Sequence, residues 1–170
     1  VKNSYLTDFY NCYVSGKIKG TQVGGIANTA SGGKIINCYN LPMIESSGRA
    51  GGIVAYVDAG GSITIVNSYN KGEIITNGTS VGYHTSSGII GTAYHSKGTR
   101  NIINSCSIGE IISKRLTAGN FYYASGEAIV GLQNCYYLDT IVNEKVIANE
   151  NSIAFSKGDE SVINKLNTYA

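Results

Sequence analysis

Short apolar runs in this chain are separated by polar residues and glycine, and their spacing is that of strands. In residues 35–40, Ile-Ile-Asn-Cys-Tyr-Asn, strict alternation predicts that Ile35, Asn37 and Tyr39 share one face, with Ile36, Cys38 and Asn40 on the other. A period of two residues is typical of β-strands rather than helices. We therefore expect a chain built from short strands.

One short phrase that begins with asparagine recurs five times, at residues 11–13, 37–40, 67–70, 104–106 and 134–136. Its starts are separated by 26, 30, 37 and 30 residues. A glycine-rich phrase lies between the copies, at residues 23–26, 50–54 and 87–91 and in degraded form at 128–131. With a third piece of the Gly-x-Ile type, each repeat contains about three extended segments.

A unit of three short strands cannot bury its apolar face alone, whereas stacked copies share a core and satisfy each other's backbone groups. The repeats therefore predict an all-β fold, a right-handed parallel β-helix of about four to five irregular rungs. We assign it to residues 1–150. Residues 151–170 are expected to form a capping segment with a short helix, which begins at a capping box in residues 156–159.

Stacking places equivalent residues of successive repeats in columns. One column is predicted to be a ladder of side-chain amides, formed by Asn11, Asn37, Asn67, Asn104 and Asn134. The next position is Cys or Ser throughout, which suits an inward site, and we expect free thiols. Paired glycines indicate a positive φ or a close approach of two backbones. An aliphatic column is expected from Ile18, Ile44, Ile74 and Ile111.

The 37-residue repeat must loop out its surplus, because the core cross-section changes little between rungs. We expect the extra residues at 76–86 and 95–99, which are polar and include the Asn77-Gly78 turn signal. Loops on a rigid scaffold often carry binding surfaces.

Charge and composition narrow the classes of partner. The formal net charge is +2, and the charged residues are scattered singly, so nucleic acid is not an expected partner. No apolar run is long enough to span a membrane. The four cysteines, Cys12, Cys38, Cys106 and Cys135, contain no Cys-x-x-Cys pair of the kind that suggests zinc or redox chemistry. No cofactor is implied, and we expect a monomeric unit within a larger chain.

The Gly-Ile-Ile-Gly sequence at residues 88–91, with a glycine-rich turn, Asn-Cys-Tyr-Asn and Gly-x-Ile, resembles the GLUG-type repeats of bacterial surface proteins. The resemblance covers roughly residues 11–140. Only residues 88–91 keep both glycines of the signature; Asn28, Ala55 and Ala128 replace one in other copies. Such repeats occur in secreted or wall-attached proteins, including adhesin-like proteins and immunoglobulin A peptidases, usually outside the catalytic domain. The resemblance implies an extracellular location and a non-catalytic role.

Few residues suggest chemistry. Glu73 and Glu110 occupy equivalent slots and could serve as paired acids of a polysaccharide-degrading enzyme, although two solvated acids are the simpler interpretation. His84 and His95 lie in the long repeat, where they could bind a metal or a ligand, or be ordinary loop histidines. A column of Tyr13, Tyr39, Tyr69 and Tyr136 could bind ligands if it faces outward, or pack in the core if it faces inward.

The leading hypothesis is a non-catalytic structural or adhesive module of a bacterial cell-surface or secreted protein. The alternative is a module that binds a glycan or a host protein through exposed tyrosine columns or loops. A β-helical polysaccharide-degrading enzyme ranks third. An ice-binding solenoid ranks last, because Thr64 and Thr76 do not recur at corresponding positions.

Overall fold

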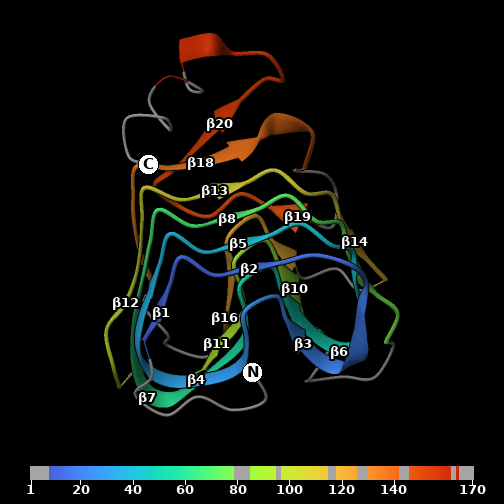
Figure 1. The fold of residues 1–170 in the computed structure, drawn as a ribbon, viewed down its shortest axis with the longest axis vertical. Helices are drawn as coiled ribbons and strands as arrows, with labels where there is room; N and C mark the ends of the chain where they lie inside the picture. The colour runs from blue at the N-terminus through green and yellow to red at the C-terminus, as the bar shows by residue number, and fades with distance from the viewer. Residues whose placement is uncertain are drawn as a thin grey trace.

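The computed structural model describes residues 8–78, 85–94, 97–114, 118–125, 130–141, 146–161 and 164. Within these ranges the chain winds into a stack of coils whose strands form three sheets, and the paired strands of each sheet are parallel (Figure 1). The predicted all-β, parallel β-helical fold is confirmed.

Along the chain, each coil runs through the first sheet, then the third and then the second. The third sheet consists of β2 (Tyr13–Val14), β5 (Tyr39–Asn40), β8 (Tyr69–Asn70), β13 (Cys106–Ser107), β18 (Cys135–Leu138) and β20 (Ser152–Phe155). The second consists of β3 (Ile18–Gly24), β6 (Ile44–Gly51), β9 (Ile74–Thr76), β10 (Ser86–Ser87), β14 (Ile111–Ser113), β15 (Ala118–Gly119) and β19 (Val146–Ile147). The first consists of β1 (Phe9–Tyr10), β4 (Ala27–Ile36), β7 (Val54–Val66), β11 (Ile90–Tyr94), β12 (Arg100–Ile103), β16 (Tyr122–Ser125) and β17 (Val130–Gln133).

Asparagine forms the corner between the first and third sheets. All five asparagines of the recurring phrase have positive φ, between 49° and 54°. Asparagine tolerates this left-handed conformation better than other residues with a side chain, because its short polar side chain bonds locally. The corner explains why the same residue type opens every copy of the phrase.

The predicted strict alternation across residues 35–40 is wrong at this corner. Ile35, Cys38 and Asn40 are all buried, whereas Ile36 and Tyr39 lie on the outside and Asn37 is exposed. The left-handed residue reorients the chain between two strands, so the two-residue period restarts beyond it. A period continues only along an unbroken extended backbone.

The Cys or Ser after each corner asparagine points inward and also makes hydrogen bonds. The Ser68 hydroxyl donates to the carbonyl of Val66 at 2.9 Å and accepts the N–H of Cys38 from the preceding coil at 3.1 Å. The Cys38 thiol makes the matching bond to Ile36 at 3.3 Å. All four cysteines are free, as predicted. The column therefore needs a small side chain that can also donate a hydrogen bond.

At the paired glycines the chain folds inward between the second and first sheets (Figure 1). These glycines do not have positive φ; they allow close approach. A β-carbon on Gly25 would lie 2.7 Å from Oδ1 of Asn40, and Gly52 and Gly88 meet Asn70 and Ser107 in the same way. The infold thus reaches the third sheet.

The buried apolar residues of the described chain form one large cluster and three smaller ones. The large cluster includes Ile35, Ile65 and Ile102, which are register partners in neighbouring coils and are at most 1% exposed. The predicted isoleucine column, paired in the order Ile18, Ile44, Ile74 and Ile111, has its first three members in one smaller cluster and Ile111 in another. Aliphatic columns of this kind bury apolar area in every coil, which is the main favourable term in folding.

The surplus of the 37-residue repeat lies almost entirely in one place. Four positions separate Ser46 from Ala50, but ten separate their partners Thr76 and Ser86. The first predicted loop, at residues 76–86, is therefore where the chain is longer. The second predicted segment, at residues 95–99, adds only one residue. Val57 and Ile63 are six positions apart, and their partners Ala93 and Arg100 in the next coil are seven positions apart.

At the C-terminal end, η1 (Asp139–Ile141) and β20 follow β18, and β20 pairs with β18 in parallel. The predicted capping box at residues 156–159 is replaced by other bonds. The Ser156 hydroxyl donates to Asp139 at 2.6 Å, while Asp159 accepts the N–H of Ser161 at 3.0 Å. Most of the predicted helix beyond this point lies outside the described residues.

Candidate interaction surface

The corner asparagines form a hydrogen-bonded ladder along the outside of the stack. Each side-chain amide donates to the side-chain oxygen of the asparagine in the preceding coil, with N–O distances of 3.1, 3.2, 3.3 and 3.0 Å from the first pair to the last. The sequence column of Asn11, Asn37, Asn67, Asn104 and Asn134 is therefore one continuous feature of the surface.

Three tyrosines stack beside this ladder on the third sheet. The ring centroids of Tyr13 and Tyr39 are 5.3 Å apart and those of Tyr39 and Tyr69 are 4.9 Å apart, with interplanar angles of 10° and 2°. Tyr13 is 62% exposed, and the other two are partly exposed. Burial, followed by the nearby Tyr39, raises the pKa of Tyr69. We call these three residues the tyrosine row.

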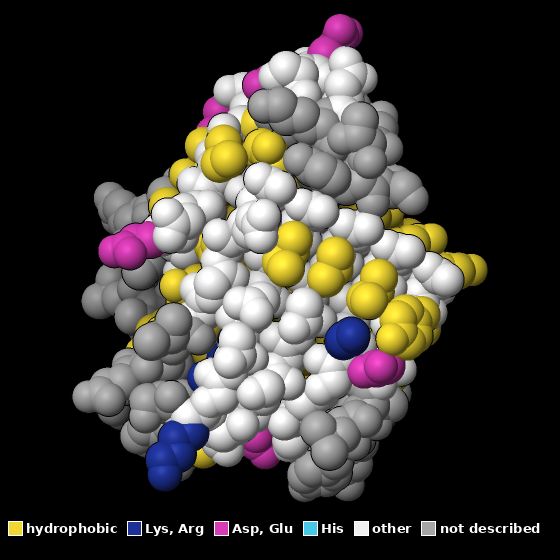
Figure 2. Space-filling view, turned by 90° about the vertical axis from the view of Figure 1, so that its left-hand side faces the viewer, with side chains coloured by type: hydrophobic (Ala, Val, Ile, Leu, Met, Phe, Trp, Pro, Cys, Tyr) yellow, Lys and Arg dark blue, Asp and Glu magenta, His cyan; other side chains and the backbone are white. Residues whose placement is uncertain are grey.

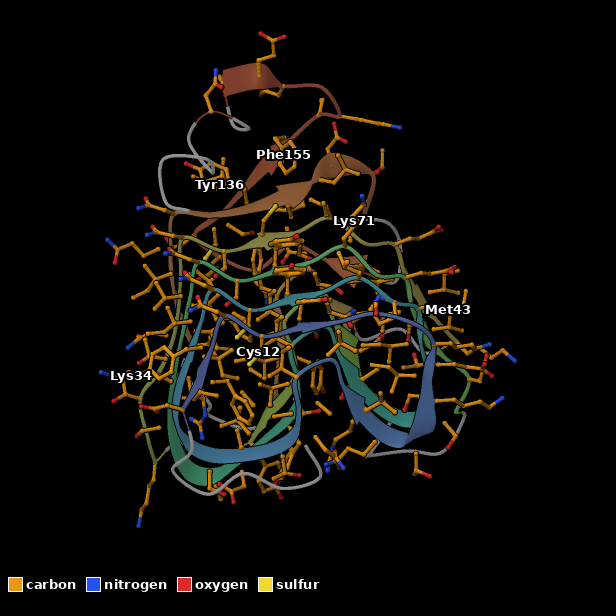
Figure 3. The ribbon with its side chains drawn as sticks, in the orientation of Figure 1. Cys12, Lys34, Met43, Lys71, Tyr136 and Phe155 are labelled. Carbon is orange, nitrogen blue, oxygen red and sulfur yellow. The ribbon has the colours of Figure 1, made fainter. Side chains whose placement is uncertain are left out.

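Tyr136 does not belong to the exposed row. Cys106 takes the place next to Tyr69, and Tyr136 follows it in register. Tyr136 is only 4% exposed and packs near Phe155 of the last strand (Figure 3). The predicted tyrosine column therefore does not face one way along its length. The tyrosine row faces outward and is accessible, whereas Tyr136 is covered.

A second row lies on the other side of the ladder, on the first sheet. It consists of the register partners Tyr10, Ile36, Val66 and Ile103, and we call it the apolar row. Figure 2 shows hydrophobic side chains in line on this face, with few charged groups around them. At the N-terminal end the Tyr10 hydroxyl bonds to Asp8 at 3.0 Å, and this bond raises the pKa of Tyr10.

Of the groups proposed for chemistry, the structure describes the two glutamates but not the two histidines. Glu73 and Glu110 do occupy the same slot of adjacent coils, because their carbonyls accept the N–H groups of Ile44 and Ile74. His84 and His95 lie outside the described residues. Across the described part of the chain, no group of three or more His, Cys, Asp or Glu could hold a metal ion. No helix in that part is long and apolar enough to cross a membrane.

Sequence reasoning missed a set of side-chain contacts within the infold. Gln22 bonds to Thr29 at 3.0 Å, Arg49 lies 4.3 Å from the ring centroid of Tyr56, and Thr85 bonds to Thr92. Each pair is separated by seven residues and straddles a Gly-Gly or Ser-Gly step, a spacing that could have revealed it. These contacts join the two limbs of the infold side chain to side chain.

A second amide ladder was also missed. Asn40 donates to Asn70 at 2.7 Å, and the two side chains also donate to Pro42 and Gly72. Both asparagines are fully buried beneath the infold glycines. The signal was present, because both are the fourth residue of the recurring phrase.

Comparison with known proteins supports the fold. No protein-family model matches the chain, and no curated protein matches it. It is similar to the crystal structure of a putative immunoglobulin A1 protease from Bacteroides ovatus, with a TM-score of 0.74 and 21% sequence identity. The match covers 98% of this chain and 57% of that chain, so this chain spans little more than half the length of the similar protein. At this identity the likeness shows the fold alone.

Proposed function

We propose that this chain is a non-catalytic structural module of a bacterial protein that acts outside the cell. One observation carries the proposal: the recurring residue types are used for contacts between coils. Asparagine supplies corners and ladders, Cys and Ser bridge neighbouring backbones, and glycine lets the infold reach the third sheet. A stiff stack held by such columns suits a spacer that carries other domains.

Three further points support this role. Glu73 and Glu110 occupy the same slot of two adjacent coils, and no group of three or more His, Cys, Asp or Glu among the described residues could hold a metal ion. Two of the cysteines, Cys38 and Cys135, are fully buried. The similar Bacteroides ovatus chain is longer than this one, which fits a module within a larger secreted protein. We further propose that the repeats are of the GLUG type and that the module has an adhesin-like role.

The test is a search for hydrolysis by the purified protein. We expect a monomer that releases no reducing ends from a panel of polysaccharides and cleaves no immunoglobulin A1. The matched control is the double variant Glu73→Gln/Glu110→Gln. Polysaccharide cleavage by the parent protein that disappears in this variant would overturn the proposal and favour a β-helical enzyme.

A binding role is the second candidate, and the exposed tyrosine row favours it. Tyrosine supplies a large amphipathic contact surface at low entropic cost in recognition. Here the three rings are already stacked and ordered, so little freedom would be lost on binding. The ligand would be a glycan or a host protein in the surroundings of the cell.

A further inference from the structure

The asparagine ladder retains unused hydrogen-bonding capacity. A side-chain amide has two donor hydrogens, and the ladder uses one of them at each step. Among the described residues no group bonds to the hydroxyls of Tyr13, Tyr39 or Tyr69. The surface therefore presents parallel lines of donors and hydroxyls to solvent.

These groups repeat with the period of the coils. The ring spacings of 4.9 and 5.3 Å set the separation of successive tyrosines, and each ladder step joins the same pair of neighbouring coils. A small ligand would use one coil only. A polymer with hydroxyls on every unit, lying along the axis of the stack, could contact several coils at once and gain from multivalency.

The chemistry of the surface selects a neutral polymer. The ladder and the two rows contain no Lys, Arg, Asp or Glu. Asp8, which bonds to Tyr10 and to the backbone of Lys34, lies at one end, and the exposed Lys34 and Lys71 flank the rows singly. An acidic polymer would find no row of positive charge there, whereas the apolar row can pack against the C–H groups of sugar rings.

The stacking of the tyrosine rings determines which of their atoms a ligand can contact. Because neighbouring ring faces cover each other at interplanar angles of 10° and 2°, the accessible parts are mainly ring edges and hydroxyls. Recognition would therefore depend on the phenol oxygens rather than on flat stacking of a sugar on a ring.

We infer that the ridge formed by the asparagine ladder, the tyrosine row and the apolar row binds a linear, neutral polysaccharide along the helix axis. This inference rests on the proposed extracellular role and names the class of ligand for it. The phenol hydroxyls and the free amide hydrogens bond to sugar hydroxyls, and the apolar row contacts the non-polar face of the chain.

The decisive variant is Tyr13→Phe/Tyr39→Phe/Tyr69→Phe. It keeps the rings and their stacking but removes the three hydroxyls. Affinity electrophoresis of the full chain would use a mixed-linkage β-glucan, a galactomannan and, as an anionic polymer, alginate. We expect retardation by at least one neutral polymer and a loss of affinity of at least tenfold in the variant, with an unchanged melting temperature.

The matched control is Glu73→Gln/Glu110→Gln, which alters a column outside the ridge and should bind like the parent. A second variant, Asn37→Gly, keeps a residue that accepts positive φ and should also weaken binding. Retardation by alginate alone, no retardation by either neutral polymer, or equal affinity of the tyrosine variant would each overturn the inference. The proposed non-catalytic role would survive those outcomes, because it fails only if hydrolysis is detected.

Discussion

The side-chain oxygen of Asn149 takes the place of a backbone carbonyl next to Phe121. In three successive coils a single backbone carbonyl accepts two consecutive N–H groups of the preceding coil. These carbonyls are those of Ile53, Ile89 and Phe121. At the end of the series the N–H groups of Phe121 and Tyr122 bond to Oδ1 of Asn149, at 2.9 and 3.0 Å. The Asn149 side chain also donates to the carbonyl of Tyr122 at 3.1 Å. One amide side chain thus imitates the peptide of a further coil.

Replacing Asn149 with alanine should loosen this end of the stack. Phe121 is fully buried, so its N–H would lose its acceptor without ready access to water, and we expect a loss of roughly 1–3 kcal/mol. Asn149→Asp keeps the acceptor and should lose less. Hydrogen exchange at the amides of Phe121 and Tyr122, together with urea unfolding, measures the effect. Equal protection in the alanine variant and the parent would refute the capping role.

Substitutions at a corner asparagine should distinguish the contribution of backbone strain to stability from that of the ladder hydrogen bonds. Asn67 has φ of 49° and bonds to both neighbours in the ladder, at 3.2 and 3.3 Å. Asn67→Gly removes the bonds but accepts the backbone angle, whereas Asn67→Ala also incurs the left-handed penalty of roughly 1–2 kcal/mol. We expect the alanine variant to be the less stable by about 1 kcal/mol in urea unfolding. The reverse order would show that the φ value does not determine the residue.

A β-carbon at the infold should be incompatible with the fold. Alanine at position 52 would overlap the carbonyl of Gly88 and the side chain of Asn70, which belong to a buried layer with no room to move. We expect Gly52→Ala to give little folded protein, as judged by circular dichroism and gel filtration. Gly20→Ala is the control, since its β-carbon would meet only the Val23 side chain, at 3.1 Å. Native-like stability of Gly52→Ala would mean that the infold can open.

The buried thiols predict both slow alkylation and sensitivity to alkali. Burial raises the pKa of Cys106 to about 12 and that of Cys135 to about 11, from 9.0. The reactive form is the thiolate, so both should react with iodoacetamide far more slowly in the folded protein than in urea, while the partly exposed Cys12 reacts first. Mass spectrometry of alkylated peptides gives the order.

The sign of the pH effect follows from the same pKa values. Above pH 9 the unfolded chain loses thiol protons that the folded chain keeps, so the free energy of unfolding should fall as the pH rises from about 9 to about 12. Cys106→Ser/Cys135→Ser should show a shallower decline over this range. An identical slope in the parent and the variant would exclude these thiols as the cause.

Some features could be read from the chain because they recur. Five asparagine phrases with intervening glycines predicted the parallel β-helix, the asparagine column and the isoleucine column of Ile18, Ile44, Ile74 and Ile111. Repetition is sufficient for this, since equal sequences in a stack must occupy equal positions. The same reasoning located the surplus of the long repeat between Thr76 and Ser86.

Which way each column faces was decided by the tertiary structure. Asn37 and Asn40 are the same residue type three positions apart, yet the first is exposed and the second is fully buried beneath an infold glycine. Likewise Tyr69 is partly exposed while Tyr136, two coils later, is covered by its neighbours near Phe155. Sequence periodicity fixes which residues lie above one another, because that depends on local spacing. Burial depends on where a corner turns the chain and on which distant segment packs against it, and a single left-handed residue or inward fold is enough to change both.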